Sequence, residues 1–147
     1  MADAIVGAAR TQRKRTPKEG TVSETSARTP IGEIIDGYFA MWNETDPERR
    51  RAAIAASWAP GASYLDPLFQ ADGPAGLDEM VVAVHQRFPG HTFRLTAAVD
   101  THHNRARWGW ELASPEGEAV AGGVDFAVLA PDGRLAEVTG FLESPAA

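Results

Sequence analysis

The sequence predicts an α+β fold in which three helices are followed by an antiparallel sheet. Up to about residue 88 apolar side chains recur at helical spacing, and beyond it they alternate with a period of two. The strand-like segments are joined by short turns, so consecutive strands should pair antiparallel. Helices followed by strands place the helices on one face of the sheet, and we expect the core between the two layers.

Proline marks the start of the first two helices. At Thr29-Pro30 a hydroxyl cap precedes a proline in the first helical turn, and Asp46-Pro47 repeats this signal. The first helix carries its apolar residues on one face: Ile31, Ile34, Ile35, Tyr38, Phe39 and Trp42. We expect the second helix to include Trp58 and to end at Pro60-Gly61.

A short strand is expected at residues 63–66, and a glycine-rich loop at residues 73–76. The third helix follows, ends before Pro89-Gly90, and has an apolar face formed by Leu77, Met80, Val81, Val84 and Phe88. Four strands complete the chain, at residues 92–99, 105–113, 118–130 and 135–142. The intervening segments 100–104, 114–117 and 131–133 contain typical turn residues.

Composition limits the chemistry. The chain has 147 residues, no cysteine and a formal net charge of -6, which fits one acidic domain. Without cysteine there is no disulfide, thiolate nucleophile or cysteine metal site. The acidic balance argues against nucleic acid as a partner. No apolar run reaches the roughly 18 residues of a membrane span, and the N-terminus lacks a signal-peptide core, so we expect a cytoplasmic location.

Charge divides the chain into two parts. Residues 1–28 carry six basic and three acidic side chains, whereas residues 29–147 are strongly acidic. We therefore predict a basic flexible tail at 1–28 and a domain at 29–147. A solvated tail is the simpler interpretation, and docking to an acidic partner is the alternative. Both lysines lie in the tail, so the domain has no lysine for Schiff-base chemistry.

Asp125 is the most informative polar residue because it interrupts an apolar strand, where aspartate is rare. If it faces inward, burial should raise its pKa, and the neutral acid could donate a hydrogen bond. The alternative is an aspartate on the outer face. Asp66, in an Asp-Pro pair at the end of a strand, is either a turn residue or part of a site. Tyr38 is either a core residue or a site residue.

Other motifs for catalysis are absent. The four histidines do not have the spacing of a metal site. The sequence contains no nucleophile elbow, phosphate-binding glycine loop or dinucleotide fingerprint. We expect no metal and no cofactor.

Five segments resemble the nuclear transport factor 2-like (SnoaL-like) superfamily. They are GYFAMWN (37–43), WAPGASYLDP (58–67), DGPAGLDEM (72–80), GGVDFAVLAPDGRL (122–135) and EVTGF (137–141), and the resemblance covers about residues 31–143. It implies a cone-shaped fold, with three N-terminal helices on a curved, mostly antiparallel sheet. It also implies a homodimer formed through the open face of the sheet.

The superfamily includes ketosteroid isomerases and polyketide cyclases. The isomerase resemblance implies that Asp66 is the general base and that Tyr38 and Asp125 bind the enolate oxygen. It suggests a cofactor-independent double-bond isomerase acting on a small apolar ketone. The substrate would lie in a hydrophobic pocket against Tyr64, Met80, Val84, Trp108, Trp110 and Phe141. Two alternatives stay open: a polyketide cyclase with Asp66 or Asp125 as acid/base, and a non-catalytic ligand-binding or dimerisation module.

Overall fold

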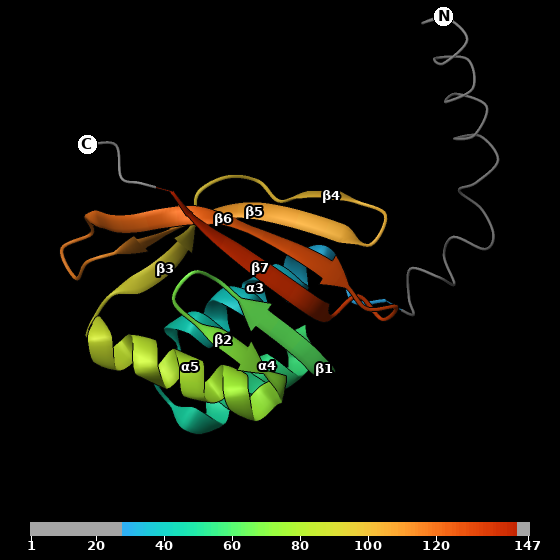
Figure 1. Ribbon diagram of the computed structural model, residues 1–147, viewed down its shortest axis with the longest axis horizontal. Coiled ribbons are helices and arrows are strands. Elements are labelled where there is room, and N and C mark those ends of the chain that lie inside the picture. Colours follow the sequence, from blue (N-terminus) through green and yellow to red (C-terminus); the bar gives the residue numbers. More distant parts are fainter. Residues whose placement is uncertain (1–27, 144–147) are drawn as a thin grey trace, which may run out of the picture.

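The computed structural model describes residues 28–143, and in this part of the chain the predicted α+β fold is confirmed. The helices α3 (Ile31–Asn43), α4 (Pro47–Ser57) and α5 (Gly73–Arg87) cover one face of a curved, open sheet (Figure 1). Except for Arg28, the predicted tail at 1–28 lies outside the described residues, as do residues 144–147. None of the described helices combines the length and the apolar character that a membrane crossing requires.

The sheet is mixed but mostly antiparallel. Its strands are β1 (Trp58–Leu65), β2 (Gln70–Asp72), β3 (Thr92–Leu95), β4 (Asp100–His102), β5 (Arg105–Ala113), β6 (Ala119–Leu129) and β7 (Leu135–Glu143). They follow the order β2-β1-β7-β6-β5-β3, and β4 pairs separately with β5. Only β1 and β7, among the described strands, pair in parallel, with Leu65 in register with Thr139. This pairing brings the residue after β1 close to the middle of β7.

The predicted end of the second helix was wrong. Helix α4 ends at Ser57, and Trp58 is already in extended conformation as the first residue of β1. The pairing of β1 with β7 changes register between Trp58 and Ser63. Pro60 is tolerated there because a proline cannot donate to a regular ladder and is confined to edges and irregularities. The buried Trp58 side chain thus belongs to the inner face of the sheet.

Two further boundaries differ from the prediction. Residues 73–76 are the first turn of α5, not a loop. The chain enters this helix through Gly73, whose φ of +71° glycine adopts readily, and Pro74 fits an early helical position. The segment 92–99 is not one strand. Strand β3 stops at Leu95, the Thr96 N–H donates to the Gly109 oxygen at 3.0 Å, and β4 then pairs with the other end of β5. Strand β2 was not predicted.

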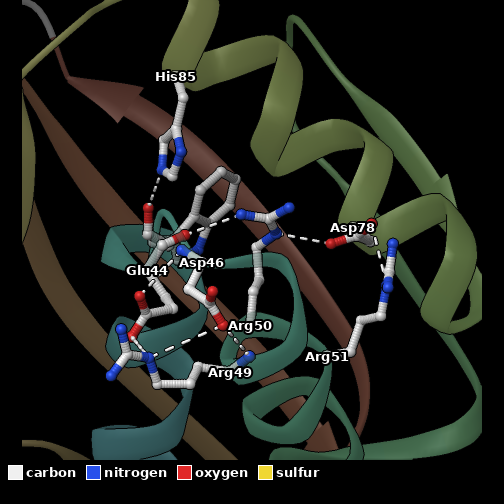
Figure 2. A network of polar contacts seen from close by, with 8 residues as sticks. Glu44, Asp46, Arg49, Arg50, Arg51, Asp78 and His85 are labelled. Carbon is white, nitrogen blue, oxygen red and sulfur yellow. Dashed lines mark hydrogen bonds and ion pairs between the residues drawn. The ribbon is translucent and has the colours of Figure 1, made fainter.

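A buried arginine ties the helices together. Arg50 on α4 is 3% exposed, and its Nε donates to Oδ1 of Asp78 on α5 at 2.6 Å (Figure 2). Another of its guanidinium nitrogens donates to the Glu44 carbonyl oxygen at 2.9 Å. On α5, Nε2 of His85 lies 2.7 Å from the carbonyl oxygen of Trp42. These contacts fix α4 and α5 against the end of α3, the helix that carries Tyr38.

Candidate active site

An apolar cavity of about 120 Å³ lies between the helices and the inner face of the sheet. Aromatic and aliphatic side chains dominate its walls, and the polar groups are few: Tyr38, Tyr64, Asp66, Asp125 and the indole of Trp110. Leu68 and Leu142 line it as well and are 61% and 44% exposed, so they mark its mouth. A concave apolar site with a few convergent polar groups is typical of a small-molecule pocket.

All three predicted catalytic residues line this cavity. Tyr38 reaches it from the inward face of α3. Asp125 reaches it from the inner face of β6, which decides between the two orientations considered for this residue. Asp66 follows β1 directly and lies beside β7 because of the parallel pairing. Side chains from three separate elements therefore meet at one place.

Tyr38 and Asp125 form a buried pair. The Tyr38 hydroxyl donates to Oδ2 of Asp125 at 2.6 Å, and the two residues are 1% and 3% exposed. Within residues 28–143, Oδ1 of Asp125 has no hydrogen-bond partner. A buried carboxyl oxygen without a partner is unfavourable, so this atom is suited to receive a ligand group.

Tyr64 and Asp66 form a second pair. The Tyr64 hydroxyl donates to Oδ2 of Asp66 at 2.6 Å. Oδ1 of Asp66 accepts the backbone N–H groups of Leu68 and Phe69, each at 2.7 Å, which is a turn closed by the aspartate side chain. Asp66 is thus both a turn residue and a lining residue of the cavity, and the turn fixes the direction of its carboxyl group.

Gly140 lies between the two pairs. It is the β7 partner of Asp125 on β6. A Cβ atom at this position would lie 2.7 Å from Oδ1 of Asp125, and 3.3 Å from both the Asp66 Cβ and the Tyr64 hydroxyl. The two carboxyl residues approach each other this closely because residue 140 has no side chain.

The surroundings raise the pKa values of Asp125, Tyr38 and Tyr64 above their ordinary values. Burial raises the pKa of Asp125 from 3.8 to about 7, an increase that the Tyr38 hydrogen bond opposes and the Asp66 charge reinforces. Burial also raises the pKa of Tyr38 and Tyr64 well above 10, and for both tyrosines the Asp125 charge adds to the effect. Near neutral pH Asp125 is therefore present in both protonation states, whereas both tyrosines remain hydrogen-bond donors.

The predicted substrate-contacting residues divide into two groups. Tyr64, Val84 and Trp110 line the cavity. Met80 and Trp108 do not, because they are packed in the core, where Trp108 meets the Tyr38 ring edge-on with centroids 5.0 Å apart. Phe141 does not line it either.

Strand alternation turns Phe141 to the outer face of the sheet, where it is 54% exposed and its ring meets that of Phe126 edge to face. Phe141 faces outward because adjacent residues of a strand point to opposite faces, and its neighbour Gly140 is buried on the inner side.

Several lining residues were not predicted. They are mainly apolar: Phe39, Trp42, Leu68, Phe69, Phe88, Phe93, Leu112, Ala121 and Leu142. The helical spacing of Phe39 and Trp42 on the Tyr38 face was a usable signal, whereas Phe93 lines the cavity beside Leu112, its partner on β5, through a pairing that the local sequence does not reveal. Within the described range, no group of three or more histidine and acidic side chains could hold a metal ion.

Comparison with known proteins identifies the family. A model of the SnoaL-like domain matches residues 35–138. The structure is similar to that of a candidate isomerase of the SnoaL-like family from Agrobacterium tumefaciens, with 44% identity, a TM-score of 0.72, and coverage of 76% of this chain and 95% of that one.

Two more distant structures share the fold. A candidate polyketide cyclase from Sinorhizobium meliloti is 17% identical with a TM-score of 0.59, covering 76% of this chain and 94% of that one. A protein with a ketosteroid isomerase-like fold from Catenulispora acidiphila is 10% identical with a TM-score of 0.59, covering 74% and 83%. No curated protein matches the sequence significantly. The extent of the family match and the 44% identity lead to one conclusion: the chain belongs to the SnoaL-like family.

Proposed function

We propose that this protein is an enzyme that moves a proton next to the carbonyl group of a small apolar ketone, without a cofactor. The observation that carries the proposal is that two carboxyl groups in unlike surroundings, Asp66 and Asp125, line one apolar cavity. Such proton transfer needs a base within reach of the carbon and a donor aimed at the developing oxyanion. Two carboxyl groups with different environments can divide these roles.

Asp66 is assigned as the base. Its Oδ1 accepts two N–H groups, whereas Oδ2 accepts, from residues 28–143, only the Tyr64 hydroxyl and so retains a lone pair for the proton. In the proposed step Oδ2 takes the proton from the carbon, and the C–H electron pair moves into the carbonyl group to give an enolate. Returning the proton to the far carbon of the enolate shifts the double bond. The similarity to the Agrobacterium tumefaciens protein described as a candidate isomerase supports this reaction class.

Asp125 is assigned as the oxyanion donor. In its neutral form Oδ1, the oxygen without a partner, can donate to the enolate oxygen. Tyr38 uses its hydroxyl proton on Oδ2 of Asp125, so it acts through Asp125 and not directly on the substrate. This differs from the role that the resemblance implied for Tyr38.

The size of the cavity favours a small ring. A cavity of about 150 Å³ holds one benzene ring, and the cavity here is about 120 Å³. A four-ring steroid would extend past Leu68 and Leu142 into solvent. The proposal therefore specifies a ketone with a single ring, or a larger ligand of which only one ring enters.

The test is the conversion of cyclohex-3-enone to cyclohex-2-enone, followed by ultraviolet absorbance. The wild type should accelerate it, and Asp66→Asn should lower kcat by about 100-fold or more, the usual contribution of a general base. Equal rates for the wild type, Asp66→Asn and buffer would reject the isomerase.

A cyclase of the aldol type is the second candidate. The free Oδ1 and near-neutral pKa of Asp125 favour it, since these properties suit a group that both takes and gives a proton. Loss of deuterium from α-deuterated cyclohexanone, measured by NMR, separates the cases. Exchange that depends on Asp125 without isomerisation would support the cyclase, and neither activity would leave a non-catalytic binding module.

The proposal also includes a cytoplasmic homodimer. The apolar pair Phe126 and Phe141 on the outer face of the sheet, 45% and 54% exposed, supports this face as the dimer contact. Sedimentation of the wild type and of Phe126→Glu would test it, the latter being expected to be monomeric.

A further inference from the structure

Trp110 carries a polar group without a partner. The nitrogen of its indole is buried, and no residue among 28–143 accepts its hydrogen bond. Trp110 lines the cavity, as does Asp125, whose Oδ1 is likewise buried and unpartnered. Buried polar groups in proteins are rarely left unmatched, so a donor and a carboxyl oxygen left open beside one cavity point to a ligand.

The strand register explains why the two groups are neighbours. Trp108 on β5 pairs directly with Asp125, and Trp110 pairs with Gly123, the next inward residue of β6. Gly123 has no side chain to separate the Trp110 ring from the sheet, and a Cβ there would lie 2.9 Å from a carbon of that ring. The indole N–H groups of Trp110 and Trp108 both act to lower the pKa of Asp125, although neither makes a regular hydrogen bond within the described residues.

We propose that the Trp110 indole N–H and the free oxygen of Asp125 together bind one oxygen atom of the ligand. A ketone or enolate oxygen would accept from the indole and from protonated Asp125. A hydroxyl oxygen would accept from the indole and donate to ionised Asp125. This inference rests on the proposed function and narrows its ligand class to an apolar ring bearing a single hydrogen-bonding oxygen.

Trp58 provides a matched control. Its indole nitrogen is also buried and without a partner in the described part of the chain. Trp58 is 2% exposed and does not line the cavity. Replacing tryptophan by phenylalanine removes the same N–H at both positions, so an effect confined to Trp110 reports the ligand contact and not the loss of an indole.

The experiment measures the binding of 4-nitrophenol, a single ring with a phenolic oxygen, by absorbance titration without turnover. The wild type should bind it, and Trp110→Phe should weaken binding by about ten-fold or more, as expected for a hydrogen bond to a charged or partly charged oxygen. Trp58→Phe should bind within about two-fold of the wild type.

A second measurement uses the unaltered protein, in case a variant does not fold. In ¹⁵N-labelled wild type the Trp110 indole signal should shift on addition of 4-nitrophenol, and the Trp58 signal should stay in place. Absence of binding to the wild type would overturn the inference, as would equal affinity of the Trp110→Phe variant or an unmoved Trp110 signal. None of these results affects the cyclohexenone assay, which decides the proposed function separately.

Discussion

The hydroxyl group of Tyr38 donates a 2.6 Å hydrogen bond to Oδ2 of Asp125, joining α3 to the inner face of β6. The bond occupies Oδ2 of Asp125 and leaves Oδ1, which has no partner among the described residues, available to a ligand in the cavity. It also stabilises the ionised form of a carboxyl group that burial alone would keep neutral. Tyr38 therefore sets both the orientation and the acidity of Asp125.

Replacing Tyr38 by phenylalanine should raise the pKa of Asp125 above its value of about 7, because the hydrogen bond that favours the carboxylate is lost. Carbon-detected NMR titration of the Asp125 carboxyl group measures this directly. Tyr64→Phe is the control, since the Tyr64 hydroxyl donates to Asp66 and not to Asp125. A pKa of Asp125 that stays fixed or falls in Tyr38→Phe would contradict the assigned role.

Asp125 should make the protein less stable as the pH rises. Its pKa is about 7 in the folded state and 3.8 as the ordinary value. Below about pH 4 the residue is neutral in both states, and between pH 4 and 7 only the unfolded chain releases the proton. The favourable contribution of the neutral acid is thus lost through this window, and it amounts to about 4 kcal/mol.

Asp125→Asn cannot ionise and should lack this dependence. Urea unfolding of both proteins from pH 4 to 8 tests the prediction. The free energy of unfolding of the wild type, relative to that of Asp125→Asn, should decrease between about pH 4 and 7 and level off above pH 7. A constant difference would mean that Asp125 is ionised in the folded protein at low pH.

The local sequence contained most of the fold and the identity of the three central residues. Asp125 stands out because an aspartate in an apolar strand is rare, and Asp66 because Asp-Pro ends a strand. The direction in which each of these side chains points depends on strand pairing, which the local sequence pattern does not reveal. The parallel register of β1 with β7 brings Asp66 to Gly140, and a register shift absorbs Pro60 within β1.

The wall of the cavity was harder to predict. Trp108 and Trp110 share a strand face, yet Trp108 is packed in the core against Tyr38, whereas Trp110 lines the cavity beside Phe93. Phe93 lines the cavity from β3, beside its β5 partner Leu112. Which inward side chains line the cavity depends on where the helices end over the sheet. Hydrophobic periodicity alone does not determine those positions.

Asp78→Asn should destabilise the helical layer by about 3 kcal/mol, because it removes the negative charge that lies 2.6 Å from the buried Arg50 guanidinium. Urea unfolding measures the change. Arg51→Ala is the control: Arg51 also meets Asp78, at 3.7 Å, but its side chain is 65% exposed, so its loss should change stability by less than about 1 kcal/mol. Similar effects of the two substitutions would show that burial of Arg50 is unimportant.

Gly140→Ala should impair catalysis more than stability. The added methyl group would lie 2.7 Å from Oδ1 of Asp125, so this carboxyl group must turn away from its present direction. Gly109→Ala is matched to it, since Gly109 lies on β5 of the same sheet and its added methyl group would lie 2.5 Å from Oγ1 of Thr96. Gly109 lies on the strand face opposite the inward Trp108 and Trp110.

Both glycine variants should lose similar stability in urea, whereas only Gly140→Ala should lower kcat for cyclohex-3-enone, by about ten-fold or more, as is usual when a donor to an oxyanion is misplaced. The decrease should appear in kcat more than in KM, since the misplaced group acts on the transition state. Equal activity of the two variants would mean that the space over Gly140 plays no part in the reaction. The reacting atoms would then have to bind nearer the mouth of the cavity, between Leu68 and Leu142.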